Sequence, residues 1–93
     1  MAKRQFIIDI GKEQIPVEGH QPRNVAIKYL MKRRRSLLMT RDKEKVERLW
    51  TELPQTIKIL GKQSQKSYKI NWEREGTQEF VGARFVFMLE DLD

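Results

Sequence analysis

The sequence predicts a small α+β protein whose mostly antiparallel sheet carries two helices on one face. Segments rich in β-branched and aromatic residues stand near both ends of the chain, and two segments with helical spacing lie between them. Strands grouped on either side of helices are typical of α+β domains. A length of 93 residues suits one domain, placed at residues 1–93. The expected order is β-β-α-(β)-α-β-β-β.

A β-hairpin is expected at the start of the chain. Residues 4–10 are β-branched and aromatic, with apolar side chains at every second position. The alternation resumes at Ile15 and Val17 after a short turn that contains Gly11. Pro16 has no N–H to donate to a neighbouring strand, so the second strand should lie at a sheet edge.

The first helix is expected to begin at Pro22 or Arg23, because proline is well tolerated in the first helical turn. We expect it to end near Arg33. A longer helix would place Arg34 within the apolar stripe, and a buried guanidinium without a partner is costly. Residues 36–39 are therefore predicted to form a separate short strand or connector. The apolar residues at helical spacing are Ala26, Ile27, Leu30 and Met31.

The second helix has the clearest pattern. Thr40 is the expected N-cap, Asp42 and Glu44 favour the positive end of the helix, and Pro54 ends it. Its apolar face is predicted to consist of Val46, Leu49, Trp50 and Leu53.

Three strands are predicted after this helix, over residues 56–60, 67–73 and 78–89. The last of them has apolar residues on both faces. This pattern favours a central strand that is covered on both sides, or partly by the second copy in a homodimer.

Enzymatic activity is not expected. The chain has no cysteine and one histidine, His20, and its glycines are isolated rather than grouped in a phosphate-binding loop. We accordingly predict no catalytic residues, no metal site and no cofactor. The longest apolar run, residues 85–89, is far shorter than the ~20 residues of a membrane-spanning helix. The expectation is a cytoplasmic protein that does not associate with membranes.

Positive charge is concentrated in one part of the chain. Residues 1–50 carry thirteen basic and six acidic side chains, whereas residues 51–93 carry six and seven. No carboxylate occurs between Glu18 and Asp42. Such asymmetry indicates a surface that faces a polyanion. The candidate cations are Arg23, Lys28, Lys32, Arg33, Arg34, Arg35 and Arg41.

We therefore predict a nucleic-acid-binding protein that contacts phosphates through residues 23–41 with little sequence specificity, on DNA or RNA. Guanidinium groups suit phosphate because their planar fork donates two parallel hydrogen bonds. The main alternative is an inhibitor, adaptor or regulator that docks the same cations on an acidic protein surface. Other interpretations are a solvated face, and a subunit of a larger assembly joined through residues 78–89.

The aromatic residues allow two interpretations. Tyr68 and Trp72 share one strand face and would stack on bases if that face were exposed. Ile70 lies between them, which favours packing in the core instead. The same reasoning places Trp50 in the core.

Overall fold

The computed structural model describes residues 3–75 and 84–92, which form strands and helices in the order β-β-α-α-β-β-β. The α+β class predicted from the sequence is confirmed. The strands are β1 (Arg4–Asp9), β2 (Gln14–Gly19), β3 (Thr56–Leu60), β4 (Gln65–Glu75) and β5 (Arg84–Asp91), and the helices are α1 (Pro22–Met39) and α2 (Lys43–Thr51).

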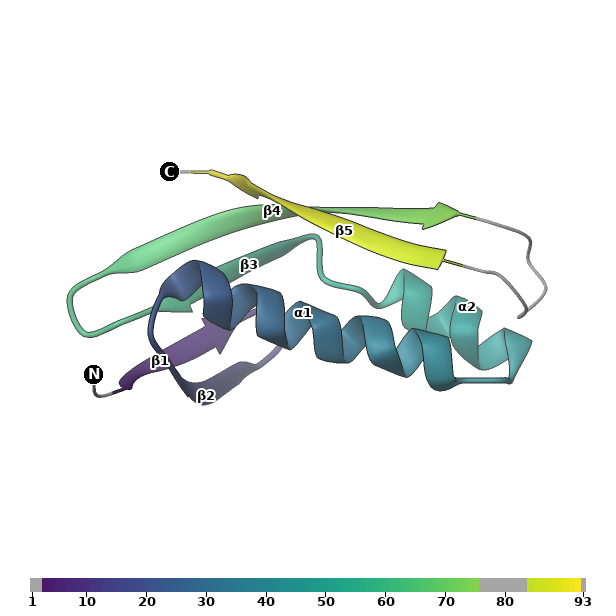
Figure 1. Ribbon diagram of the computed structural model, residues 1–93, viewed down its shortest axis with the longest axis horizontal. Helices are drawn as coiled ribbons and strands as arrows, with labels where there is room; N and C mark the ends of the chain where they lie inside the picture. The colour runs from purple at the N-terminus through teal and green to yellow at the C-terminus, as the bar shows by residue number, and fades with distance from the viewer. Residues whose placement is uncertain (1–2, 76–83, 93) are drawn as a thin grey trace.

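All five strands belong to one antiparallel sheet with the order β2-β1-β3-β4-β5. Both helices lie on the same side of this sheet (Figure 1). Among the described residues, the second side of the sheet is mostly polar and exposed, so helices and sheet form two layers. The predicted arrangement of two helices on one face of an antiparallel sheet is confirmed.

The β1–β2 hairpin forms as expected. Ile8 lies opposite Ile15, and Ile7 lies opposite Pro16. Gly11 has a φ of 93° in the turn, a conformation that costs glycine little, and its N–H donates to Asp9 Oδ1 at 2.8 Å. Because β2 is an edge strand, Pro16 does not interrupt pairing with a further neighbour.

The core consists of two clusters that follow each other along α1. The first lies beneath the N-terminal half of the helix, and its buried members are Phe6, Ile8, Val25, Ala26, Leu30, Ile57, Ile59, Tyr68 and Ile70. The second lies where α1, α2 and β5 meet, and its buried members are Leu37, Val46, Leu53 and Phe85. Trp72 packs against both clusters and connects them.

The expected end of the first helix near Arg33 is wrong, because α1 continues through Met39 as one helix of 18 residues. The predicted separate strand or connector at residues 36–39 is therefore also wrong. Leu37 lies in the second core cluster at 2% exposure, so burial of this side chain favours the longer helix. The expected penalty at Arg34 does not arise, since its Nε donates to the Phe85 carbonyl at 2.6 Å.

The cap of α2 also differs from the prediction. Asp42 is the N-cap, and its carboxylate accepts a hydrogen bond from the Glu44 N–H at 3.0 Å. Thr40 instead belongs to the end of α1, where its hydroxyl donates to the Ser36 carbonyl at 2.6 Å. A carboxylate cap also interacts favourably with the positive end of the helix, which a threonine hydroxyl does less well.

The strand predicted as central is an edge strand, so that prediction is wrong. β5 pairs with β4 alone among the described strands, and residues 78–83 of the predicted strand lie outside the described residues. Phe85 is buried, whereas Met88 on the opposite face is 71% exposed. Isolated apolar residues are common on protein surfaces, so apolar residues on both faces did not require cover on both faces. A homodimer contact through residues 78–89 stays a prediction.

Candidate nucleic-acid interface

The candidate interface is built on α1, whose buried stripe fixes which side chains point outward. Leu30 and Leu37 are buried beneath the helix at 0% and 2% exposure. Lys28 and Arg35 each precede one of these leucines by two residues, which corresponds to about 200° around a helix. Both cations therefore point away from the sheet, and both are exposed.

Lys32 completes this outward group. It follows Lys28 by four residues and precedes Arg35 by three, the spacings that bring helical side chains to one face. No acidic residue occurs within α1. Among the described residues, no carboxylate lies within ion-pair distance of these three side chains. We call Lys28, Lys32 and Arg35 the outward cations.

Arg41 lies outside α1, in the connection between the two helices, and it is exposed. The part of the chain that the structure describes contains no ion pair of its guanidinium. Arg41 therefore adds a fourth available cation beyond the C-terminal end of the helix.

The other three predicted cations make contacts within the protein. Arg23 pairs with Asp91 of β5 at 3.7 Å. Arg33 pairs with Glu13 of the β1–β2 turn at 3.6 Å, and its guanidinium also donates to the Tyr29 hydroxyl at 2.9 Å. These ion pairs are partly exposed, so water and salt weaken them.

Arg34 differs most from the sequence-based expectation. Its side chain is partly buried and donates to the backbone carbonyl of Phe85 on the edge strand β5. The structure thus divides the seven predicted cations into four without an ion pair among the described residues and three that contact other parts of the protein.

Exposed apolar residues accompany the outward cations. The expectation that Met31 belongs to the apolar stripe of the first helix is wrong, and sequence reasoning missed Leu38 and Met39. Met31, Leu38 and Met39 are 53%, 47% and 74% exposed on α1. The signal was the helical periodicity itself, since extending the helix past Arg33 assigns Leu37 to the core and leaves Leu38 outside. The assumed break near Arg33 concealed this difference.

The aromatic residues of β4 face the helices, so the base-stacking interpretation is wrong and packing in the core is confirmed. Tyr68 is 4% exposed. Trp72 is partly buried, with its indole N–H donating to the Pro54 carbonyl at 3.0 Å and its ring centroid 5.2 Å from that of Phe87. Trp50 is also partly buried, and its ring centroid lies 5.5 Å from that of Phe85.

His20 lies in the exposed connection that leads to α1. Its backbone carbonyl accepts a hydrogen bond from Arg4 Nη2 at 2.6 Å. Among the described residues, no group of three histidine, aspartate or glutamate side chains is placed to hold a metal ion. Neither described helix has the length and apolar character needed to cross a membrane.

Comparisons of the chain with protein-family models, with curated proteins and with solved structures gave no match. The described residues show a small α+β protein with a cationic face on α1.

Proposed function

We propose that the protein is a non-enzymatic nucleic-acid-binding protein that contacts phosphates through the outward cations and Arg41. The observation that carries this proposal is the position of Lys28, Lys32 and Arg35 on one exposed helix face, where no carboxylate of the described residues lies within ion-pair distance of them. A ligand with repeated negative charges can approach this face without displacing a contact that holds the fold together.

The spacing of the outward cations suits a nucleic-acid backbone. Lys28 and Arg35 are separated by about 10 Å along the helix axis. Successive nucleotides of one B-DNA strand advance by about 3.4 Å along the duplex axis, so cations spread over this distance can contact more than one phosphate. Contacts of this kind position a protein on a duplex or single strand but carry little sequence information.

A second candidate function is supported by the exposed apolar residues of the same helix. Met31 lies between Lys28 and Arg35 in the sequence and is 53% exposed. Methionine is common at adaptable protein interfaces. An acidic protein surface with apolar residues is therefore the alternative partner.

The decisive experiment measures nucleic-acid affinity as a function of salt concentration. Four phosphate contacts should give a log–log slope of about −3.5 on duplex DNA and about −3 on a single strand, because each contact releases condensed counterions. The triple variant K28Q/K32Q/R35Q should flatten the slope by about two to three units and weaken binding similarly for all sequences.

The matched control removes the same charge from the sheet. Lys58, Lys66 and Lys69 are exposed residues of β3 and β4, and replacing all three by glutamine should leave the slope near the wild-type value. Equal losses in both triple variants would show that net charge, rather than α1, determines binding. If the wild type binds neither DNA nor RNA at about 50 mM salt, where phosphate contacts are strong, the proposal is wrong. A protein captured after nuclease treatment by the wild type, but not by K28Q/K32Q/R35Q, would then favour the second candidate.

A further inference from the structure

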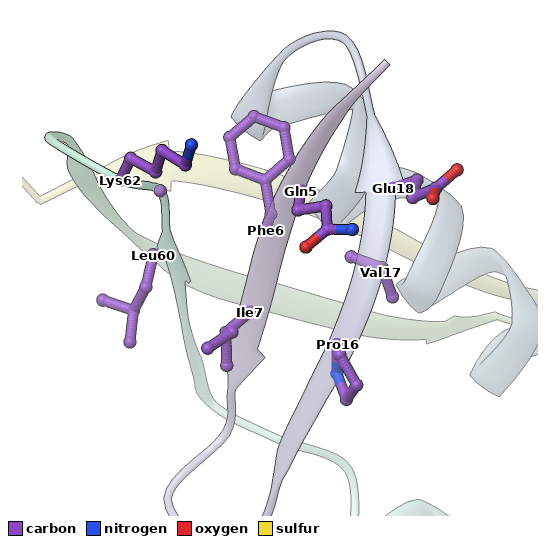
Figure 2. Close-up of a pocket in the computed structure, with 9 residues that line it drawn as sticks. Gln5, Phe6, Ile7, Pro16, Val17, Glu18, Leu60 and Lys62 are labelled. Carbon is purple, nitrogen blue, oxygen red and sulfur yellow. The ribbon is translucent and has the colours of Figure 1, made fainter.

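The sheet opens between β1 and β3 at one end. β1 pairs with β2 along its whole length, from Arg4 to Asp9. Its pairing with β3 covers only residues 7–9 and stops at the Ile7–Leu60 pair. The first half of β1 therefore has a strand neighbour on one side and the loop between β3 and β4 on the other. Figure 2 shows the two strands separating beyond Ile7 and Leu60.

The opening contains a hollow with a volume of about 710 Å³, within the range of small-molecule sites. Three of its lining residues are cations, Lys3, Arg4 and Lys62, and none is acidic. Polar side chains that donate hydrogen bonds add to this lining, namely Gln5, Gln63 and Ser64. We call this hollow the β1–β3 notch.

Contacts within the protein hold parts of the notch in place. Arg4 Nη2 donates to the His20 carbonyl at 2.6 Å, and the guanidinium carbon lies 5.4 Å from the centroid of the Phe6 ring. Gly61 closes the opposite loop through a hydrogen bond from its N–H to the Ser64 carbonyl at 2.7 Å. A β-carbon at Gly61 would lie 2.6 Å from Ser64 Oγ, so a larger residue there would require the exposed Ser64 side chain to rotate. Arg4 on one wall of the notch and Gly61 on the other are thus each held by contacts within the protein.

A second hollow adjoins the notch on the solvent-facing side of the sheet. It has a volume of about 530 Å³ and shares Gln5, Phe6, Gly61 and Lys62 with the notch. Beyond these residues its floor is mostly apolar, formed by Ile7, Pro16, Val17 and Leu60, and Glu18 adds one carboxylate to the lining (Figure 2). A cationic hollow next to an apolar floor suits a ligand with an anionic group at one end and a flat, weakly polar group at the other.

We infer that the β1–β3 notch binds the phosphate monoester of a nucleotide, with the nucleoside lying over Ile7, Pro16 and Leu60. A phosphate monoester carries about two negative charges and three strong acceptor oxygens near pH 7, which matches three cations and several donors. The guanidinium of Arg4 can donate to two of these oxygens, and the ammonium groups of Lys3 and Lys62 supply point charges. The nucleotide is either free or the 5′-phosphorylated end of a strand; the second source rests on the proposed function.

The test compares ligands that differ only in the phosphate. Binding of AMP and of adenosine is measured by NMR chemical shifts, and binding of one single-stranded oligonucleotide by fluorescence anisotropy with a 5′-phosphate or a 5′-hydroxyl end. AMP should shift the amide signals of Ile7 and Lys62, and adenosine should not. The 5′-phosphorylated strand should bind about three to ten times more tightly than the 5′-hydroxyl strand, as expected for a few exposed ion pairs.

Two single variants test whether the preference for a phosphate group depends on the notch. Lys62→Gln removes a cation from the notch, and Lys66→Gln removes an exposed cation from β4 outside it. The first should lower the affinity for the phosphorylated ligand about two- to fivefold, and the second should leave the preference for phosphate intact. Equal effects of the two variants would overturn the inference.

The outcomes also separate this inference from the proposed function. If the wild type neither binds AMP nor distinguishes the two strand ends, the inference is wrong, while salt-dependent binding of both strands would still support α1 as the interface. Binding of AMP without binding of either strand would support the notch and contradict the proposed function. A preference for the 5′-phosphorylated strand would identify the strand end as the ligand, and AMP binding without this preference would identify the free nucleotide.

Discussion

The two sides of α1 use the same residue types for different purposes. Lys28, Lys32 and Arg35 face solvent, whereas Arg33 and Arg34 on its flanks contact Glu13 and the Phe85 carbonyl. Four of these residues are consecutive in the sequence, from Lys32 to Arg35. Because neighbouring helical residues differ by about 100° in direction, a run of cations cannot form one surface. Each cation in such a run therefore has to be placed on the outer or inner side of the helix before it is assigned to a partner.

The largest loss of stability is expected for Leu37, because its burial determines which side chains of α1 point outward. Leu37→Ala should lower the free energy of unfolding by about 2–5 kcal/mol, because it leaves a cavity in the second core cluster. Leu38→Ala is the matched control, since Leu38 is 47% exposed and should have little effect. Chemical denaturation of both variants measures the difference. Equal destabilisation would contradict the packing of α1 beyond Arg33.

A smaller effect is expected at the flank of α1. Arg34→Met keeps side-chain length but removes the donor to the Phe85 carbonyl, and should lower the free energy of unfolding by about 1–3 kcal/mol. Arg35→Met removes the same charge from the exposed face and should leave the denaturation midpoint near that of the wild type. If Arg35→Met is the more destabilising variant, the assignment of the two arginines is reversed.

The smallest expected effect is a difference in the salt dependence of binding between the outward cations and the cations that form ion pairs. Replacing Lys28 and Lys32 by glutamine should flatten the salt dependence by about two units, whereas replacing Arg23 and Arg33 should flatten it by less than about one. Both double variants lose two positive charges, so long-range attraction is weakened equally. Anisotropy titrations at several salt concentrations give both slopes. Similar slopes would mean that Arg23 and Arg33 leave Asp91 and Glu13 to contact phosphates.

Much of the fold followed from patterns that are local in the sequence. The alternation before and after Gly11 predicted the hairpin, and Pro16 predicted that β2 lies at an edge. The apolar spacing from Val46 to Leu53 predicted α2. These features could be predicted from the sequence because each depends on residues only a few positions apart.

The wrong predictions concern features of local structure whose energy depends on a contact with a distant part of the chain. The partner of Arg34 is the carbonyl of Phe85, which is 51 residues away in the sequence. Without that acceptor, ending the helix near Arg33 was the less costly solution. The edge position of β5 likewise depends on how the strands are ordered, which apolar residues on two faces do not determine.

The candidate site was partly accessible from the sequence. The absence of carboxylates between Glu18 and Asp42 indicated a cationic segment, but two cations of α1 are paired with acids outside it, Glu13 and Asp91. The β1–β3 notch was not accessible, because it joins Arg4 to Lys62 across the sheet. Only the register between β1 and β3 brings them to one hollow.

The contact between Arg34 and Phe85 also bears on aggregation. An edge strand has backbone groups without a neighbouring strand, and these groups invite pairing with another chain. At β5, a guanidinium held by α1 occupies one of the carbonyls, and at β2 the opposite edge contains Pro16, which has no N–H to offer. A second chain that added its strand to β5 would have to displace this guanidinium, and one that added to β2 would find a gap in the ladder of hydrogen bonds.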